Sequence, residues 1–454
     1  MPPKRVQKRT TRRRLLAKAY STITDLPNEI LLMILSLVDG FDLYSLALLC
    51  KRLHTIALPI YLARFNISPH YPYLANHNFE GIKGLRIALF ITKLQSLEFS
   101  IPGTPILSVQ RLAERMSSIT SARLTTIHEY CDGPKQIKPF KNFMDVLAQK
   151  SCEDLAILGS CDWGQETVRN VRIRLFRSLR TVTFKANFLF TASFRKWTIG
   201  SLNASQIHSL YLSATAAALA DILPHLTLPS LGTFSLECLG LSFTTLTAFL
   251  ARHESVLTLE IDSPLLLDGP FPVGVLPYLS KIKGGVQLFL HLNSKPNALP
   301  KLNVVKISIW DKPPKQFFEG LARTNVSQIC LPLENHVYEQ LLALPIGKTR
   351  LSFARAERKL DRVLSLELDF SAPCDTVAKI PGWLALFPAV TSVSFPGWGF
   401  HSWPRQKKTA VAREISVLCP KMKNITFCFT SGTIEEWCSE PAPQSSVRIQ
   451  LQTY

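Results

Sequence analysis

The residue types that carry out catalysis are present in this sequence, but their spacing favours no reaction. Gly347-Lys348-Thr349 resembles the end of a phosphate-binding loop, yet Leu342 stands where such a loop requires glycine and no strand is expected before it. The ten cysteines form no CxxC pair and no zinc-finger spacing with histidine. No GxSxG, HExxH or GxGxxG motif occurs. The sequence therefore predicts no catalytic residue, no metal site and no cofactor, although an active site built from residues distant in the sequence stays open.

Composition places the chain among ordered globular proteins. Apolar residues make up 46% and charged residues 19% of the 454 positions, which suggests two or three domains or one elongated repeat array. The longest apolar runs stop short of the about 18 residues that a membrane span needs, so no membrane partner is expected. No hydrophobic signal segment is found near residue 1, and we therefore expect a reducing compartment, cytoplasm or nucleus, with free buried cysteines.

Positive charge is concentrated at the start of the chain. The formal net charge is +19, and residues 1–20 supply eight lysines and arginines with no acid. This pattern predicts a disordered basic tail. A nuclear import signal and a nucleic-acid-binding arm are the alternatives, and the latter would make nucleic acid a partner.

A short apolar helix is predicted over residues 26–38, LPNEILLMILSLV. Asp25 offers a capping oxygen, Pro27 suits a first helical turn, and Asp39-Gly40 is expected to end the helix. Leu32, Met33 and Leu37 occupy positions that a surface helix would give to polar residues. The helix is therefore predicted to be apolar on nearly every side.

Two further short helical pieces follow. One is expected to be capped by Asp42, and another, Ile56 to Phe65, is expected to be interrupted at Pro59. About 45 residues this apolar cannot bury all their own surface, so the excess predicts a partner-binding face or docking onto the rest of the chain.

The same segment, LPNEILLMILSLVDGFDLYSLALLCKRLHTIA, resembles an F-box. The resemblance rests on Leu26-Pro27, Glu29, Ile30-Leu31, Ile34-Leu35, Asp42-Leu43, Leu46, Cys50-Lys51 and Leu53, and it departs at His54, where the family often has Trp or Tyr. It implies a three-helix domain, assigned to residues 21–68, that packs on the small linker subunit of an SCF-type cullin-RING ubiquitin ligase. The residues implied to contact that linker are Leu26, Pro27, Ile30, Ile34, Leu43, Leu46 and Leu49. A helical hairpin that only docks on its own protein is the alternative.

Beyond the F-box-like segment, helical and strand patterns alternate in a way typical of a largely parallel sheet. A strand template consists of an apolar residue, a second one three positions later and a third one two positions after that. It can be placed at Leu94, Leu124, Cys152, Leu179, Ile207, Leu231, Val256, Leu279, Leu302, Val326, Val363, Val390 and Met422, and the placements at Leu124 and Leu279 lack the third apolar residue. Most intervals lie near the roughly 20 to 29 residues of leucine-rich repeats. The unit FTTLTAFLARHESVLTLEI predicts a helix face of Phe243, Leu246, Phe249 and Leu250, followed by the inward strand residues Val256, Leu259 and Ile261.

Proline supports the same period. In LPSL, LPYL, LPKL, FPAV and CPKM, beginning at residues 228, 276, 299, 387 and 419, proline stands two positions before the template. It would end the preceding helix and direct the chain into the strand. The pattern resembles the irregular leucine-rich repeats found behind an F-box and implies an open solenoid with a curved parallel sheet over residues 85–454; a doubly wound sheet or a barrel remains an alternative.

Alternate strand residues would face outward on such a sheet, where a long target could lie. The predicted target-binding residues are Tyr211, Glu237, Glu260, Asp262, Lys283, Lys306 and Trp310. They form either a solvated charge ladder across parallel strands or a site for a basic peptide.

The sequence thus predicts an α/β protein, a three-helix F-box followed by a repeat solenoid, that acts as a non-catalytic substrate adaptor. Its expected partners are the linker subunit, the cullin scaffold and a target protein of unknown identity. A binding scaffold without a ligase role and a nucleic-acid-associated protein using the basic tail are the rival readings.

Overall fold

The computed structural model describes residues 23–70, 72–74, 79–101, 106–126, 137–159, 172–295, 297–312, 314–333, 360–370, 384, 387–396, 404–428, 433–438 and 448–451. The predicted basic tail and the Gly-Lys-Thr segment at 347–349 lie outside these residues. The chain forms two compact units. Unit 1 comprises Met1–Leu179 with Ala192–Trp197, and unit 2 comprises Arg180–Thr191 with Thr198–Tyr454.

Unit 1 begins with three α-helices, α2 (Asn28–Leu37), α3 (Gly40–Ala47) and α4 (Lys51–Arg64), preceded by the 3-10 turn η1 (Ile23–Asp25). Their ends differ from the sequence expectation. Pro27 itself is the N-cap of α2, with no side-chain capping bond. Asp39 rather than Asp42 caps α3, because its Oδ1 accepts the Asp42 backbone N–H at 2.8 Å. Helix α4 runs without interruption through Pro59, since packing outweighs the loss of one backbone bond.

The core of these helices is a small aliphatic cluster. Leu31 and Leu35 of α2, Leu43 of α3 and Leu53 of α4 are each at most 1% exposed. Two arginines of α4 hold both ends of α2. Arg52 Nη2 donates to Leu26 O at 2.6 Å, and Arg64 Nη2 donates to Ser36 O at 3.3 Å, so the free carbonyls at the C-terminal end of α2 gain a cationic donor.

Helix α4 is anchored on α5 (Phe79–Ile87) through Tyr61. The Tyr61 hydroxyl donates to the backbone oxygen of Glu80 at 3.0 Å, and its ring lies against Gly84, where an added Cβ would come within 2.7 Å of Tyr61 Cε1. Burial, together with Glu80, raises the pKa of Tyr61. His54 fixes the other end of the contact, because Nδ1 bonds Ala47 O at 3.0 Å and the ring packs edge-on against Phe90.

The rest of unit 1 is a parallel sheet of strands that follow chain order. They are β1 (Tyr73–Leu74), β2 (Lys93–Ile101), β3 (Ser118–Thr126) and β4 (Asp154–Gly159), joined by α5, α6 (Ile106–Arg115) and α7 (Ile137–Gln149). The register pairs Leu94 with Ile119, so the template placed at Leu124 was wrong by five residues. The correct match passes through Ala122, a small core residue that gives a weak hydrophobic signal.

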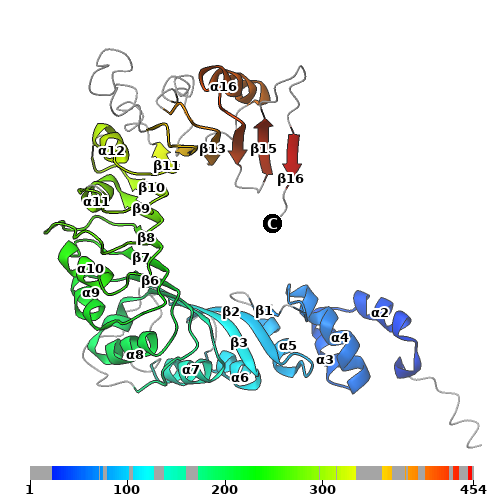
Figure 1. Ribbon diagram of the computed structural model, residues 1–454. Coiled ribbons are helices and arrows are strands. Elements are labelled where there is room, and N and C mark those ends of the chain that lie inside the picture. Colours follow the sequence, from blue (N-terminus) through cyan, green and yellow to red (C-terminus); the bar gives the residue numbers. More distant parts are fainter. Residues whose placement is uncertain are drawn as a thin grey trace, which may run out of the picture. The chain divides into compact units, whose positions relative to one another are not determined.

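Unit 2 continues the same alternation. Its strands are β5 (Thr181–Lys185), β6 (Ser209–Ser213), β7 (Thr233–Glu237), β8 (Thr258–Ile261), β9 (Lys281–Gly285), β10 (Val304–Ile309), β11 (Gln328–Leu333), β12 (Ser365–Phe370), β13 (Ser392–Pro396), β14 (Asn424–Cys428), β15 (Thr433–Cys438) and β16 (Arg448–Leu451). Its helices are η4 (Asn187–Phe190), α9 (Ala216–Ile222), η5 (Leu223–His225), α10 (Phe243–Leu250), α11 (Val286–Leu292), α12 (Pro314–Leu321) and α16 (Arg405–Leu418), and α8 (Ala192–Asn203) crosses the boundary between the units. Neighbouring strands are parallel from β5 to β14, whereas β15 and β16 are antiparallel, which the sequence did not predict. Helices α9 to α12 follow one another along one side of strands β6 to β11 (Figure 1).

A turn of constant geometry precedes many of these strands. In all five proline-bearing sequences the fourth residue donates its N–H to the carbonyl of the first, as Leu231 does to Leu228 at 3.1 Å. Proline is the second residue of each turn, where its fixed φ fits. Two units without proline, ending at Val256 and Val363, make the same bond. The five prolines therefore lie in turns that lead into strands, while the two units without proline show that the turn also forms in its absence.

The strand starts repeat a second feature. Two consecutive N–H groups donate to one carbonyl of the preceding unit, as Ser280 and Lys281 do to Leu257 O at 2.9 and 3.0 Å. The carbonyls that accept such a pair belong to Arg180, His208, Gly232, Leu257, Ser280, Asn303, Ser327, Leu364 and Thr391. The described strands from β6 to β14 thus start in an equivalent way, and they pair in chain order without the reversal of a doubly wound sheet.

The buried residues of α10 and β8 are those that the sequence predicted for this unit. Phe243, Leu246, Phe249 and Leu250 of α10 and Val256, Leu259 and Ile261 of the following strand segment are all buried, which confirms that part of the sequence interpretation. At Leu279 the template lacks its third apolar residue because Gly284 stands there. An added Cβ on Gly284 would lie 2.8 Å from Leu288 Cδ2, so the Leu288 side chain fills that place in the core.

Candidate functional site

Helices α2 and α3 expose an unusual amount of apolar surface for so small a segment. Leu37 is 88% exposed, Phe41 81%, Leu49 70% and Met33 65%. Smaller exposed fractions are found at Ile30, Leu32, Ile34 and Leu48. We call these eight side chains the apolar face. Clustered large apolar side chains that stay in water mark an interaction surface, whereas isolated ones do not.

The predicted linker-contacting residues divide into three groups. Pro27, Ile30, Ile34 and Leu49 are exposed, and Leu26 and Leu46 are half-buried. Leu43 is fully buried, since it points from α3 into the helical core, and we remove it from the set. None of the four exposed residues is covered by the described residues of the chain.

Sequence reasoning named fewer surface residues than the structure exposes. Leu32, Met33, Leu37, Phe41 and Leu48 were not in the predicted set. A signal for three of them existed, because Leu32, Met33 and Leu37 occupy positions on α2 where a polar residue is expected. Phe41 and Leu48 lie at the two ends of α3, and their exposure depends on where that helix starts and stops.

The sheet of unit 2 carries the second set of predicted residues. Tyr211 and Glu237 lie on β6 and β7, and the Tyr211 hydroxyl donates to Glu237 Oε2 at 2.5 Å. Lys185 Nζ lies 2.7 Å from the same oxygen. The Lys185 and Tyr211 bonds lower the pKa of Glu237, while burial and then the Glu237 bond raise the pKa of Tyr211. The carboxylate is therefore already engaged twice.

The neighbouring charges are paired in the same way. Lys283 Nζ lies 2.8 Å from Asp262 Oδ1, and the predicted Glu260 is 3.2 Å from Lys281, a residue outside the predicted set. Lys306 is 3.3 Å from Glu367. Partial burial alone would lower the pKa of Lys306, but the Glu367 carboxylate outweighs it and the pKa is raised.

Cys330 of β11 lies in register between Lys306 and Glu367. It is 6% exposed, and burial raises the pKa of its thiol to about 12. The predicted residues of the sheet thus form the cross-strand charge ladder, with every described charge named here held by a partner.

Trp310 does not belong to this face. The register between β9 and β10 shifts between Ile307 and Ile309, which makes Ser308 a β-bulge residue. After the bulge the alternation of side chains changes. Trp310 packs edge-on against the buried Phe317 of α12, with ring centroids 5.6 Å apart, and donates its indole N–H to Pro332 O at 2.7 Å. The sequence could not reveal the bulge and so assigned Trp310 to the wrong side.

Three histidines of unit 2 bond the backbone, and each serves the fold. His253 is buried, and its ring accepts the Leu228 N–H at 3.0 Å while contacting Phe249 O at 2.7 Å. His208 and His291 bond the backbone oxygens of Ser230 and Gly269. Across the described residues, no three His, Cys, Asp or Glu side chains lie close enough to hold a metal ion. In the same residues, no helix has both the length and the apolar character to cross a membrane.

Comparison with known proteins assigns one part of the chain. Residues 23–65 match the model of the F-box-like family. These residues include α2, α3 and α4 and carry the whole apolar face. A search of curated proteins returned no match to this sequence. The chain therefore has an F-box-like domain at its N-terminal side, followed by an α/β region with a parallel sheet.

Proposed function

We propose that this protein is a substrate-recognition subunit of an SCF-type cullin-RING ubiquitin ligase. The observation that carries the proposal is the apolar face of α2 and α3, exposed within a segment that matches the F-box-like family. In that role the face is covered by the linker subunit, which joins the protein to the cullin scaffold.

The energetics support a partner of this kind. Leu37, Phe41 and Leu49 together present three large side chains that are each at least 70% exposed. Covering one such side chain contributes on the order of 1.5–3 kcal/mol. The three-helix core is complete without them, because Leu31, Leu35, Leu43 and Leu53 already fill it. The exposed residues are thus available for association rather than for folding.

We further propose that unit 2 is an irregular leucine-rich-repeat array that binds the target protein. The recurring turn and the paired strand-start hydrogen bonds support one structural unit repeated along the chain. The role is non-catalytic. Ubiquitin transfer is carried out by other subunits, and this chain raises the effective concentration of a target lysine near the charged ubiquitin carrier.

Co-purification with the linker subunit tests the proposal. The test compares the native chain with Ile34→Glu combined with Leu49→Glu, which places two charges on the apolar face at exposed positions. We expect the native chain to recover the linker and the double variant to lose it. Leu239→Glu is the matched control, because Leu239 is also exposed, at 74%, but lies in unit 2.

Leu239→Glu should recover the linker as the native chain does, since a charge there leaves the apolar face unchanged. Failure of the native chain to recover linker would reject the ligase role. Retention of the linker by the double variant would reject the proposed surface. Circular dichroism should show that all three proteins are folded, because every substituted side chain is at least 38% exposed.

A further inference from the structure

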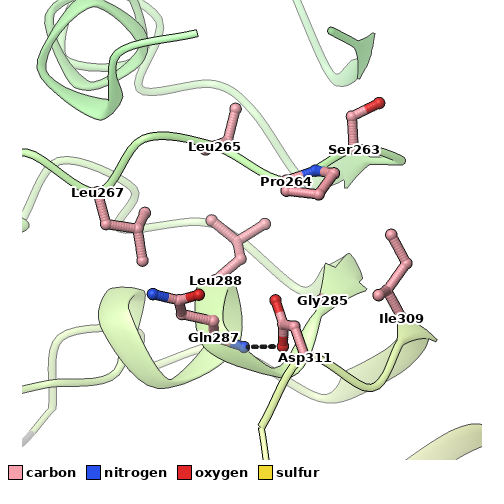
Figure 2. A pocket seen from close by; sticks show the side chains of 9 residues that line it. All are labelled: Ser263, Pro264, Leu265, Leu267, Gly285, Gln287, Leu288, Ile309 and Asp311. Carbon is pink, nitrogen blue, oxygen red and sulfur yellow. Dashed lines mark hydrogen bonds between the residues drawn. The ribbon is translucent and has the colours of Figure 1, made fainter. Parts of the chain in front are cut away.

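Two hollows in unit 2 differ in size. Figure 2 shows the smaller one, where the Gln287 backbone N–H donates to Asp311 Oδ1 at 2.8 Å beside the segment that follows β8. Its volume is about 20 Å³, and a single water needs about 10–15 Å³. The larger hollow has a volume of about 180 Å³, so it has room for a ligand of several non-hydrogen atoms.

The larger hollow is built from three consecutive units. The segment after α11 contributes Asn293 and Asn297, the turn after α12 contributes Arg323 and Asn325, and Arg362 stands before β12. We call this hollow the arginine cavity. No carboxylate is among the residues that line it, so its polar side chains are either cationic or neutral.

Arg323 differs from the arginine at the same place in an earlier unit. Arg252 also stands two residues after its helix, α10, and its guanidinium donates to Ala248 O at 2.9 Å and to Leu223 O at 2.7 Å. Arg252 therefore serves the fold. The guanidinium of Arg323 is exposed and makes no hydrogen bond or ion pair with the described residues.

The C-terminal end of α12 is satisfied without Arg323. Gly320 O accepts Asn293 Nδ2 at 2.9 Å, and Leu321 O accepts the Thr324 hydroxyl at 2.8 Å. Asn293 and Thr324 are 4% and 7% exposed, so both bonds lie in the wall of the cavity. These carbonyls do not require a cation, and the Arg323 guanidinium stays available to a ligand.

Arg362 is positioned by Asn325. Its Nη1 donates to Asn325 Oδ1, which leaves the Asn325 Nδ2 group without a bond to the described residues. The cavity is therefore lined by two guanidinium groups and a free amide N–H₂. Arginine presents N–H donors in a planar fork that suits the paired oxygens of a carboxylate or a phosphate.

The turns around the cavity are basic as well. The described parts of the turns that lead into β10 to β14 are residues 293–303, 322–327, 360–364, 387–391 and 419–423. Their charged side chains are the cations Lys295, Lys301, Arg323, Arg362, Lys421 and Lys423 and the acid Asp361. Asp361 is exposed and does not line the cavity. The excess of positive charge favours the approach of an anion.

We propose that the arginine cavity binds an oxoanion group, either a carboxylate or a phosphate. Arg323 and Arg362 donate charge-assisted hydrogen bonds to its oxygens, and Asn325 Nδ2 donates a neutral one. The site lies at the amino ends of β11 and β12, apart from the paired charges of the sheet. The inference goes beyond the proposed function and does not depend on it.

Isothermal titration calorimetry of the full chain tests the proposal with two probes, inorganic phosphate and acetate, at an ionic strength held constant with potassium chloride. We expect saturable binding of at least one probe, and the tighter of the two identifies the class of oxoanion. Arg323→Gln and Arg362→Gln should each weaken that binding by about tenfold or more, because each removes a charge-assisted donor.

Lys421→Gln is the matched control. It removes one positive charge from the same set of turns but lies outside the cavity, so the dissociation constant should change by less than about twofold. All three substituted side chains are exposed. Circular dichroism should therefore show native helix and strand content in each variant.

Three results would overturn the inference: no saturable binding of either probe to the native chain, unchanged binding in both arginine variants, or equal weakening in Lys421→Gln and the arginine variants. The last result would mean that the basic turns attract anions without a defined site. Linker recovery does not enter this test. Loss of the ligase role would therefore leave the anion binding intact, and loss of the anion binding would leave linker recovery intact.

Discussion

The apolar face of α2 and α3 and the charged face of the sheet in unit 2 differ in whether their side chains already have partners within the chain. On α2, α3 and the turn after α3, Leu37, Phe41 and Leu49 are each at least 70% exposed among the described residues. On the sheet, Lys283 has Asp262 and Lys306 has Glu367 within 3.3 Å. The first surface gains free energy whenever anything apolar covers it, whereas the second must exchange existing ion pairs for new ones.

This difference separates affinity from selectivity. Apolar burial contributes free energy roughly in proportion to area and depends little on salt. Exchange of an ion pair contributes little net free energy but penalises a partner with the wrong charge. A protein that must hold one constant subunit and choose among many targets would use the first kind of surface for the subunit and the second kind for the choice.

The largest effect is expected from a leucine that looks similar in sequence to those of the apolar face. Leu43 is 0% exposed, so Leu43→Ala should destabilise the three helices by about 2–5 kcal/mol. Leu49→Ala, at an exposed position, should change the stability of the helices by less than about 0.5 kcal/mol. Hydrogen exchange of the amides in residues 28–64 measures both, and equal protection in the two variants would contradict the division into core and face.

A second, smaller effect is expected where α4 meets α5. Gly84→Ala would place a methyl group 2.7 Å from the Tyr61 ring, which is held by Glu80. Displacing the ring should cost about 1–3 kcal/mol. Proteolysis between α4 and α5 should become faster, while Gly240→Ala, at a positive-φ loop position in unit 2, should leave that cleavage unchanged. Unaltered cleavage in Gly84→Ala would show that the contact does not restrain the helices.

The sequence predicted the helical segment and the repeated strands because both depend on local patterns. Apolar residues at helical spacing mark α2, and the template two residues before each strand marks β5 to β14, including β9, where the third position is glycine. The order of the strands in the sheet follows their order in the sequence, because each strand pairs with the next one along the chain.

Other features depended on contacts that no local pattern records. Leu43 and Leu49 are both leucines near α3, and only the packing of α4 decides that one is buried. The bulge at Ser308 turns the Trp310 side chain towards α12 and away from the charged face of the sheet. The sequence around Ser308 shows only the usual alternation of inward and outward strand residues. Asp311 lies against Gly285, a residue 26 positions earlier in the chain, where an added Cβ would be 2.6 Å from Oδ2, and spacing in the sequence does not reveal this contact.

A third prediction concerns acid stability in unit 2. Hydrogen bonds from Ser242 and Thr244 lower the pKa of Asp268 to about 2, from an ordinary value of 3.8. Because the folded-state pKa is depressed, its contribution to stability is complete above about pH 4 and is lost as the pH falls towards 2. Asp268→Asn should remove this part of the pH dependence. Urea unfolding at pH 5 and pH 3 measures the free energy of unfolding of the native chain and of the variant. The difference between the two free energies should be smaller at pH 3, and an equal difference at both pH values would contradict the role of the carboxylate.

The smallest effect should come from the sheet charges themselves. Asp262 and Lys283 are 30% and 27% exposed at their side chains, and ion pairs that water still reaches couple by about 0.2–1 kcal/mol. A double-mutant cycle with Asp262→Asn and Lys283→Met, followed by urea unfolding, measures that coupling free of each single effect. The coupling should shrink further at high salt, because water reaches both side chains. A coupling above about 2 kcal/mol would mean that the ion pairs stabilise the sheet strongly. The two surfaces would then still differ in charge, but the sheet charges could no longer be exchanged at little cost in free energy.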